Sequence, residues 1–202
     1  MALPLMRDQI TPHSFILMDD AHQHHTLYKD LSFIVVNNDQ KFGNQCVFPA
    51  GPLRENYQKG MDRADGFFLI HDPHCKGSDF TISTTKPIFD IDVHYQCALK
   101  NCRVIGFCGV GYPPRFRNAL ALQGLDVCDC IYFPNHHKYT ALDEKKLIDR
   151  AEKSCASLIT TAKDWVRLSP RMRSHVDILG QSFSFQKSAL WNHFLKERIG
   201  QC

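Results

Sequence analysis

Seven short runs of β-favouring residues recur along the 202-residue chain, and segments with helical periodicity separate the later runs. This alternation predicts an α/β fold in which helices cover a mainly parallel sheet. The runs cover residues 15–18, 31–36, 66–70, 103–108, 126–133, 157–161 and 175–179.

Start and stop signals predict three helices in the second half of the chain. Pro113 and Pro114 open one helix, and Gly124 ends it. Thr140 and Asp143 resemble a capping box that starts a second helix. A last helix carries apolar residues on one face, namely Leu190, Trp191, Phe194 and Leu195.

Residues 73–102 have a different hydrophobic pattern, because polar and apolar residues alternate there without a helical period. This segment is predicted to form a short two-stranded hairpin or linker between two α/β units. The expected organisation is therefore a partial domain over residues 1–72, a β linker over 73–102 and a C-terminal α/β domain over 103–202.

Composition excludes several classes of function. The 24 basic and 21 acidic residues are well mixed and leave a net charge of +3, so no nucleic-acid partner is predicted. The nine cysteines are irregularly spaced and the N-terminus lacks the order of a signal peptide, which predicts reduced thiols and a cytosolic chain. The apolar runs are far shorter than the roughly 20 residues of a membrane-spanning helix.

Two carboxylates, Asp19 and Asp20, directly follow the first apolar run. In open α/β sheets ligands gather at the carboxyl ends of the strands, where such a pair could hold Mg²⁺ through oxygen atoms. The alternative is a simple turn, because turns favour Asp for local reasons.

The stretch "FGNQCVFPAGPLRE" is broken by Gly and Pro and delivers Arg54 and Glu55 side by side. Arginine offers a planar fork that suits phosphate, and glutamate can add an oxygen ligand or orient a neighbour. The alternative is a surface turn with a solvated charge pair.

Two further stretches follow predicted strands. "GVGYPPRF" over 109–116 has the layout of a phosphate-binding helix N-terminus but lacks the Lys-Ser or Lys-Thr of a P-loop, so a tightly packed strand-to-helix turn is favoured. "FPNHHKY" over 133–139 presents His136 and His137, either of which could act as a general base. The alternative for this pair is an exposed loop.

Histidine and cysteine are abundant enough to suggest a metal-binding protein. No C-x-x-C pair and no H-x-x-x-H spacing is present, however, and a structural zinc site needs such spacing. Buried thiols within a sheet explain Cys128, Cys130 and Cys108 better.

Taken in order, a series of motifs resembles the later two-thirds of the tetraacyldisaccharide 4'-kinases, the lipid A 4'-kinase family. The resemblance runs from about residue 15 to the C-terminus, and its most specific piece is "PAGPLRE". The motifs are "DDAHQHHTL", "KDLSFIVVNNDQKFGNQCVFPAGPLRE", "RADGFFLIHD", "VIGFCGVGYPPRF", "LQGL", "FPNHHKY" and "TTAKDWVRL".

The resemblance implies an ATP- and Mg²⁺-dependent phosphotransferase. Its substrate would be an acylated glucosamine disaccharide 1-phosphate, whose 4'-hydroxyl is phosphorylated to give lipid IV-A. The expected location is cytoplasmic, in peripheral contact with the inner face of the inner membrane of a Gram-negative bacterium. The expected fold is the remainder of a P-loop-type α/β/α domain, a two-stranded linker and a C-terminal α/β/α domain.

The resemblance also implies roles for residues in the first motif. Asp19 and Asp20 match the acidic pair that the family associates with Mg²⁺. Gln23 and His24 belong to the same motif and would contact the cofactor in the active-site cleft.

Three catalytic roles follow from the later motifs. Arg54 and Glu55 match the end of the "PAGPLRE" signature, which faces the nucleotide and metal. His136 matches the histidine that the family pairs with an aspartate to activate the sugar hydroxyl.

The chain departs from the family pattern in several places. No P-loop ending in Gly-Lys-Thr occurs in the 202 residues, so a separate P-loop half is expected as a partner and catalysis by this chain alone is expected to be impaired. Four positions carry unusual residues: Ala21 in place of Gly, Tyr112 in place of Asn, Asn135 in place of Asp and Ala162 in place of Glu. The alternative prediction is a non-catalytic α/β remnant or binding protein.

Overall fold

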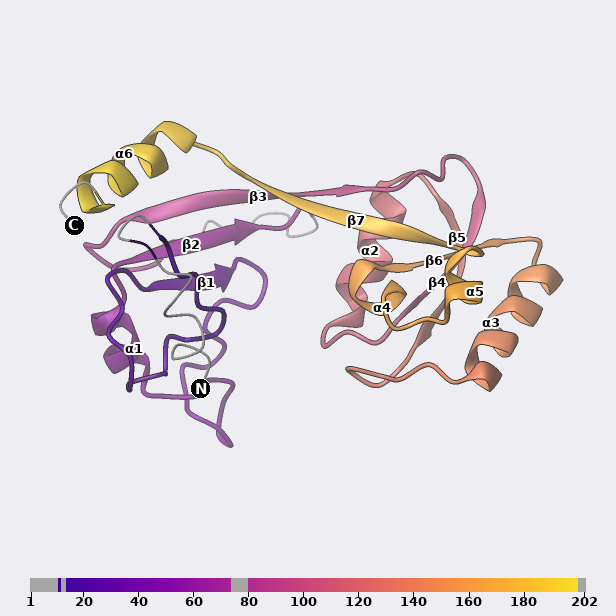
Figure 1. Cartoon of the computed structure of the whole chain (residues 1–202), viewed down its shortest axis with the longest axis horizontal. Helices are drawn as coiled ribbons and strands as arrows, with labels where there is room; N and C mark the ends of the chain where they lie inside the picture. Colours follow the sequence, from indigo (N-terminus) through magenta and orange to yellow (C-terminus); the bar gives the residue numbers. More distant parts are fainter. Residues whose placement is uncertain (1–10, 12–13, 74–79, 200–202) are drawn as a thin grey trace.

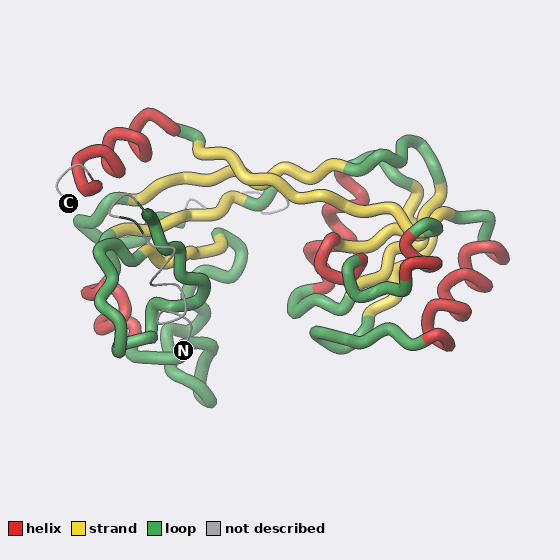
Figure 2. Tube along the Cα trace, in the orientation of Figure 1, coloured by secondary structure: helices red, strands yellow, loops and turns green. Residues whose placement is uncertain are grey.

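A computed structural model describes residues 11, 14–73 and 80–199 of the chain. Two lobes lie side by side and are joined by a long ribbon of two strands (Figure 1). The N-terminal lobe comprises residues 14–73 and the first half of β3, and the C-terminal lobe comprises residues 103–179. Outside its strands and one short helix, the N-terminal lobe consists mostly of loops (Figure 2).

One seven-stranded sheet runs through both lobes, in the order β1-β2-β3-β7-β6-β4-β5. Every neighbouring pair is parallel except β3 and β7, which are antiparallel. The predicted α/β fold with a mainly parallel sheet is therefore confirmed. The strands are β1 (Phe33–Asn37), β2 (Gly66–His71), β3 (Ile88–Gln96), β4 (Arg103–Cys108), β5 (Asp126–Tyr132), β6 (Ser157–Thr161) and β7 (Val176–Phe185).

The ribbon between the lobes is built from strands that are distant in sequence. The first part of β7 pairs with β6 in the C-terminal lobe, and residues 180–185 then pair with 91–96 of β3. The hairpin alternative for residues 73–102 is therefore wrong for the described part of that segment, whereas a two-stranded linker is present, built from β3 and β7. Its single strand, β3, finds its antiparallel partner about 90 residues later in the chain.

The prediction of a strand over residues 15–18 is also wrong. These residues lie outside every strand, and Leu17 is 97% exposed. A strand needs a hydrogen-bonded neighbour, and among the described residues β1 pairs only with β2. The other six predicted runs each overlap a strand.

Local signals explain where the main helices begin. Two prolines open α2, and the Thr140 hydroxyl and the Asp143 carboxylate form the predicted capping box at the start of α3. The predicted last helix is confirmed as α6. The helices are α1 (Tyr57–Arg63), α2 (Pro113–Leu122), α3 (Ala141–Lys153), α4 (Ala162–Trp165), α5 (Pro170–Arg173) and α6 (Ser188–Ile199).

The core of the C-terminal lobe lies on both faces of its sheet. Alternate residues of β4 point to opposite faces, so Val104 belongs to the cluster under α2, whereas Ile105 and Phe107 belong to the cluster under α3 and α5. Burial on both faces is the expected environment of a parallel strand and explains the continuous apolar sequence of β4.

The N-terminal lobe packs α1 against one face of its strands and an aromatic group against the other. Trp191 of α6 lies 5.2 Å from Phe68 of β2 and 5.0 Å from Phe89 of β3, measured between ring centroids. The last helix thus contacts the strands of the N-terminal lobe (Figure 1). The three-part division of the chain stays a prediction.

Candidate active site

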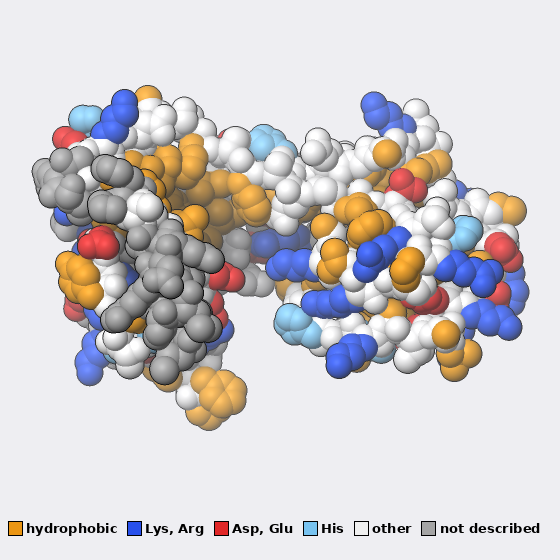
Figure 3. Space-filling view, in the orientation of Figure 1, with side chains coloured by type: hydrophobic (Ala, Val, Ile, Leu, Met, Phe, Trp, Pro, Cys, Tyr) orange, Lys and Arg blue, Asp and Glu red, His pale blue; other side chains and the backbone are white. Residues whose placement is uncertain are grey.

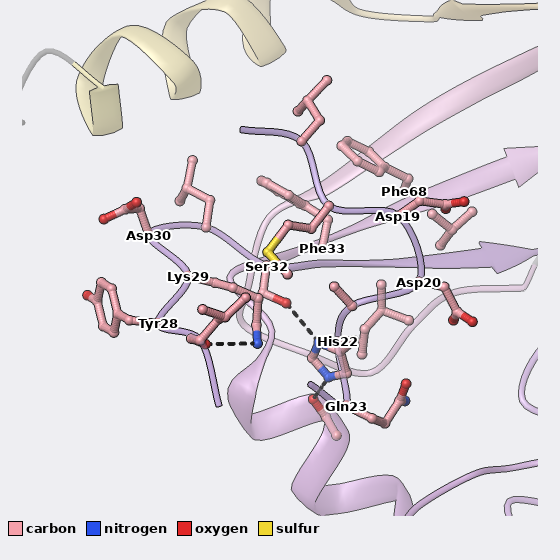
Figure 4. Close-up of a pocket in the computed structure, with 18 of the residues that line it drawn as sticks. Asp19, Asp20, His22, Gln23, Tyr28, Lys29, Asp30, Ser32, Phe33 and Phe68 are labelled. Carbon is pink, nitrogen blue, oxygen red and sulfur yellow. Dashed lines mark hydrogen bonds between the residues drawn. The ribbon is translucent and has the colours of Figure 1, made fainter. Parts of the chain in front are cut away.

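Residues from three separate segments line a hollow of about 1860 Å³ in the N-terminal lobe. The segments are 14–23, the region around β1, and 53–57, and α6 closes one side. Figure 4 shows the 19–23 loop beside the strands that carry Phe33 and Phe68. Of the residues predicted to form the site, five line this hollow: Asp19, Asp20, Gln23, Arg54 and Glu55.

The first contact between the predicted residues is an ion pair. Arg54 Nη1 donates to Asp20 Oδ2 at 2.7 Å, and each side chain is 66% exposed. An exposed pair of this kind contributes little stability, about 0 to 1 kcal/mol, so it can exchange partners readily. Asp20 has a φ of 51°, which places it in the left-handed region that Asp tolerates in turns.

Glu55 forms the second contact. Its Oε1 accepts a hydrogen bond from Gln23 Nε2 at 3.1 Å and another from Arg63 Nη2 at 2.6 Å. The Arg63 hydrogen bond is the main reason why the pKa of Glu55 is lowered, and Gln23 adds to it. Glu55 therefore remains a carboxylate near neutral pH, held at the base of the 19–23 loop.

His22 ties this loop to the lobe. Its Nε2 lies 3.0 Å from the Gly60 carbonyl oxygen and its Nδ1 lies 2.8 Å from Ser32 Oγ (Figure 4). A carbonyl only accepts hydrogen bonds, so Nε2 carries a proton, and in the neutral ring Nδ1 then accepts from the Ser32 hydroxyl. The histidine thus has a structural role that the sequence motif alone did not indicate.

Asp19 and His24 lie in places that differ from the prediction. Asp19 begins a turn that follows an irregular segment rather than the predicted strand, because residues 15–18 form no strand. His24 does not line the hollow that holds the other residues, and its Nδ1 lies 3.2 Å from Thr26 Oγ1.

The carboxylates that line the hollow could hold a magnesium ion only together with other ligands. Within residues 11, 14–73 and 80–199, no group of three or more His, Cys, Asp or Glu side chains could hold a metal ion. Magnesium commonly uses only one or two carboxylates and takes its other ligands from water and nucleotide phosphates. Asp19 and Asp20 suit that arrangement better than a site built wholly from protein.

His136 lies in the other lobe, in the loop between β5 and α3. Its backbone N–H donates to Gly109 O at 3.2 Å, and its Nδ1 lies 3.0 Å from Arg167 Nη2. It is not among the residues that line the hollow of the N-terminal lobe. The two predicted halves of the site are therefore separate in this structure.

The neighbouring histidine, His137, makes different contacts. His137 Nε2 lies 3.1 Å from Asp143 Oδ2, and its ring stacks on Phe133 with centroids 4.7 Å apart. Of the two adjacent histidines, His137 is thus engaged with the start of α3, whereas His136 is exposed.

An ion cluster joins the lobes at the carboxyl ends of β1 and β2. Arg115 of α2 donates from Nη2 to Asp39 Oδ2 at 2.9 Å. Its Nε lies 2.9 Å from Asp72 Oδ2 as an ion pair without hydrogen-bond geometry, and the Tyr95 hydroxyl donates to the same oxygen at 3.0 Å. Lys and Arg side chains gather on the wall of the C-terminal lobe that faces the N-terminal lobe (Figure 3).

These features define an α/β protein in which Asp39 and Asp72 follow the parallel strands β1 and β2 and meet Arg115. The carboxyl ends of parallel strands are where such folds bind their ligands. Residues 2–199 match the family model described as tetraacyldisaccharide-1-P 4'-kinase, LpxK. The chain belongs to this family.

Individual relatives agree with the family model. The tetraacyldisaccharide 4'-kinase of Caulobacter vibrioides is 35% identical over 171 residues, which cover 81% of this chain and 51% of that protein. The enzyme of the same name from Rhodopseudomonas palustris is 33% identical over 201 residues, 93% of this chain and 58% of that protein. The chain therefore spans about half the length of the curated relatives that it matches.

A solved structure resembles the fold. The crystal structure of LpxK from Aquifex aeolicus in complex with ATP matches with a TM-score of 0.65 and 25% identity, over 90% of this chain and 55% of that one. In the part of the chain that the structure describes, no helix is long and apolar enough to cross a membrane.

Proposed function

We propose that this chain contributes to the ATP-dependent phosphorylation of the 4'-hydroxyl of an acylated glucosamine disaccharide 1-phosphate, which yields lipid IV-A. Family membership over residues 2–199 supports the reaction class. The observation that carries the proposal is the convergence of Asp20 with Arg54 and of Gln23 with Glu55, from segments more than 30 residues apart, in one hollow.

The charged groups in the hollow have complementary tasks in phosphoryl transfer. Bound Mg²⁺ would neutralise phosphate charge, and Asp19 and Asp20 are the residues that would hold it beside the nucleotide. Arg54 can leave its exposed contact with Asp20 and pair with phosphate oxygens, because a guanidinium fork suits them. Glu55, which Arg63 holds in place, links the 53–57 segment to the 19–23 loop through its hydrogen bond with Gln23.

The sugar hydroxyl would be handled from the other lobe by His136. Reacting atoms must approach to about 3 to 3.5 Å for transfer, so the substrate has to bridge the lobes or the lobes have to approach. We propose that the phosphate-binding loop comes from residues outside these 202, on a separate P-loop half. We further propose peripheral contact with the inner face of the bacterial inner membrane, where an acylated substrate would reside.

Reconstitution tests the proposal. The purified chain is mixed with γ-labelled ATP, Mg²⁺ and the disaccharide 1-phosphate, with and without the part of the Caulobacter vibrioides relative that it does not cover. We expect label transfer only in the complete mixture, and loss of that transfer when EDTA removes Mg²⁺.

Matched variants identify the site in the complete mixture. Asp20→Asn and His136→Ala are each expected to lower turnover by about 10²-fold or more. Asp149→Asn, on the exposed side of α3, removes the same charge far from the site and should leave turnover unchanged. Absence of transfer in every mixture would favour the non-catalytic binding protein instead.

A further inference from the structure

Three loops of the C-terminal lobe converge on one buried carboxylate, Asp164. Its side chain is fully buried, and Oδ2 accepts hydrogen bonds from Gly109 N at 3.1 Å and Thr161 Oγ1 at 2.8 Å. Its other oxygen, Oδ1, lies 3.4 Å from Arg167 Nη1. A buried charge needs such partners, so Arg167 is held beside Asp164 at a fixed place.

The other arm of the same guanidinium reaches His136. Arg167 Nη2 lies 3.0 Å from His136 Nδ1. A guanidinium has only donors, so Nδ1 must be the acceptor and must carry a lone pair. The remaining ring nitrogen, Nε2, therefore bears the proton of the neutral imidazole. A doubly protonated ring would place two donors and two positive charges against each other.

The backbone fixes the position of the same ring. His136 has a φ of 61°, in the left-handed region, and its N–H donates to the carbonyl of Gly109. Gly109 also donates its own N–H to Asp164. Asp164 is therefore linked to His136 twice, to its backbone through Gly109 and to its ring through Arg167.

We propose that Arg167 is a positioning residue that holds His136 as the tautomer with the proton on Nε2. In this tautomer His136 presents a hydrogen-bond donor at Nε2, which suits an anionic phosphate or alkoxide oxygen. Removal of a proton from a hydroxyl by Nε2 would need the opposite tautomer, which Arg167 opposes by donating to Nδ1. The catalytic consequence rests on the proposed function, whereas the tautomer does not.

Nitrogen NMR of the full 202-residue chain labelled with ¹⁵N-histidine tests the tautomer directly. The spectrum is recorded near pH 8, where an ordinary imidazole is neutral, and His136 is assigned by the signals lost in His136→Gln. We expect a protonated, pyrrole-type Nε2 and an unprotonated, pyridine-type Nδ1. A proton mainly on Nδ1 in the unmodified chain would overturn the proposal, and this result requires no Arg167 variant to fold.

Two variants separate the specific contact from general charge. Arg167→Gln is expected to move the His136 signals toward a mixture of tautomers. Arg171→Gln removes an equal charge from an exposed position four residues away and should leave them unchanged. Identical His136 signals in a folded Arg167→Gln protein and in the unmodified chain would also contradict the proposal.

Kinetics of the reconstituted mixture distinguish this inference from the proposed function. In that mixture Arg167→Gln should change kcat by about tenfold and alter the pH profile of kcat. The KM for ATP should stay within about twofold, because Arg167 lies in the C-terminal lobe whereas Asp19 and Asp20 lie in the N-terminal lobe. If no mixture transfers phosphate while the NMR shows the Nε2–H tautomer, the proposed function fails and the role of Arg167 toward His136 stands. An unchanged kcat and pH profile would show that the tautomer has no catalytic consequence.

Discussion

At the scale of single residues, the C-terminal site depends on one glycine at which loops meet. A Cβ atom added at Gly109 would lie 2.8 Å from Pro134 O and 3.3 Å from Asp164 Oδ1. The backbone can therefore approach these loops only because the side chain is absent. Gly111, two residues later, has no atom within 4 Å of the corresponding position.

This difference gives a matched pair of variants. Gly109→Ala should lower the free energy of unfolding by about 1 to 3 kcal/mol, because backbone and a buried carboxylate would have to shift. Gly111→Ala should change it by no more than about 0.5 kcal/mol. Urea unfolding measured by fluorescence compares the two, and equal midpoints would show that the loops around Gly109 can relax without cost.

The sequence indicated several charged residues of the site but not the residues that contact and orient them. It singled out Asp20, Arg54 and Glu55, and the structure brings these into one hollow. It missed Arg63 and Arg167, because their partners Glu55 and His136 are joined to them by the fold and no local spacing indicates such contacts. The roles of the predicted site residues stay predictions.

At the scale of elements, the capping box of α3 has a charge that can be titrated. Asp143 Oδ2 accepts hydrogen bonds from Thr140 N at 3.0 Å and from Thr140 Oγ1 at 2.8 Å, and His137 Nε2 lies 3.1 Å away. The Thr140 backbone hydrogen bond is the largest cause, followed by its hydroxyl and His137, and together they lower the pKa of Asp143 to about 2.

The sign of the pH effect follows from this lowered pKa. The folded chain favours the carboxylate more than the unfolded chain does, so the stabilisation is fully present only well above 3.8, the ordinary pKa of aspartate, and is lost as the pH falls through about 2. Thr140→Ala should cost about 1 kcal/mol near pH 7, whereas Thr140→Ser keeps the hydroxyl and should cost less. Thermal unfolding followed from pH 7 to pH 2 should show the Ala penalty shrinking with acidity, and a constant penalty would contradict this account.

Elements with local signals were predictable, and those defined by distant partners were not. The prolines before α2 and the capping box of α3 lie within their own segments and gave correct starts. Residues 15–18 have the composition of a strand but lack a neighbour to pair with among the described residues. The segment that contains β3 predicts a hairpin or linker, but no local pattern indicates that its partner β7 comes from the other end of the chain.

At the scale of the whole molecule, two connections set how the lobes sit. The first connection is the ribbon of the paired strands β3 and β7, which run from one lobe into the other (Figure 1). The second connection is the cluster in which Arg115 contacts Asp39 and Asp72, with side chains that are 24%, 14% and 2% exposed. No sequence pattern indicated this cluster, because its three members are far apart in the chain. Asp39 follows β1, Asp72 follows β2 and Arg115 lies in α2.

Removal of the arginine should therefore loosen the lobes without unfolding the sheet. Arg115→Gln leaves two carboxylates poorly compensated and should cost about 2 to 3 kcal/mol. Since the ribbon remains, we expect a larger radius of gyration in small-angle X-ray scattering while the circular dichroism stays unchanged. Arg117→Gln, on the exposed side of the same helix, is the matched control. If the two variants scatter identically, the cluster does not fix the distance between the lobes. The ribbon and the packing of α6 on the N-terminal lobe must then fix that distance without it.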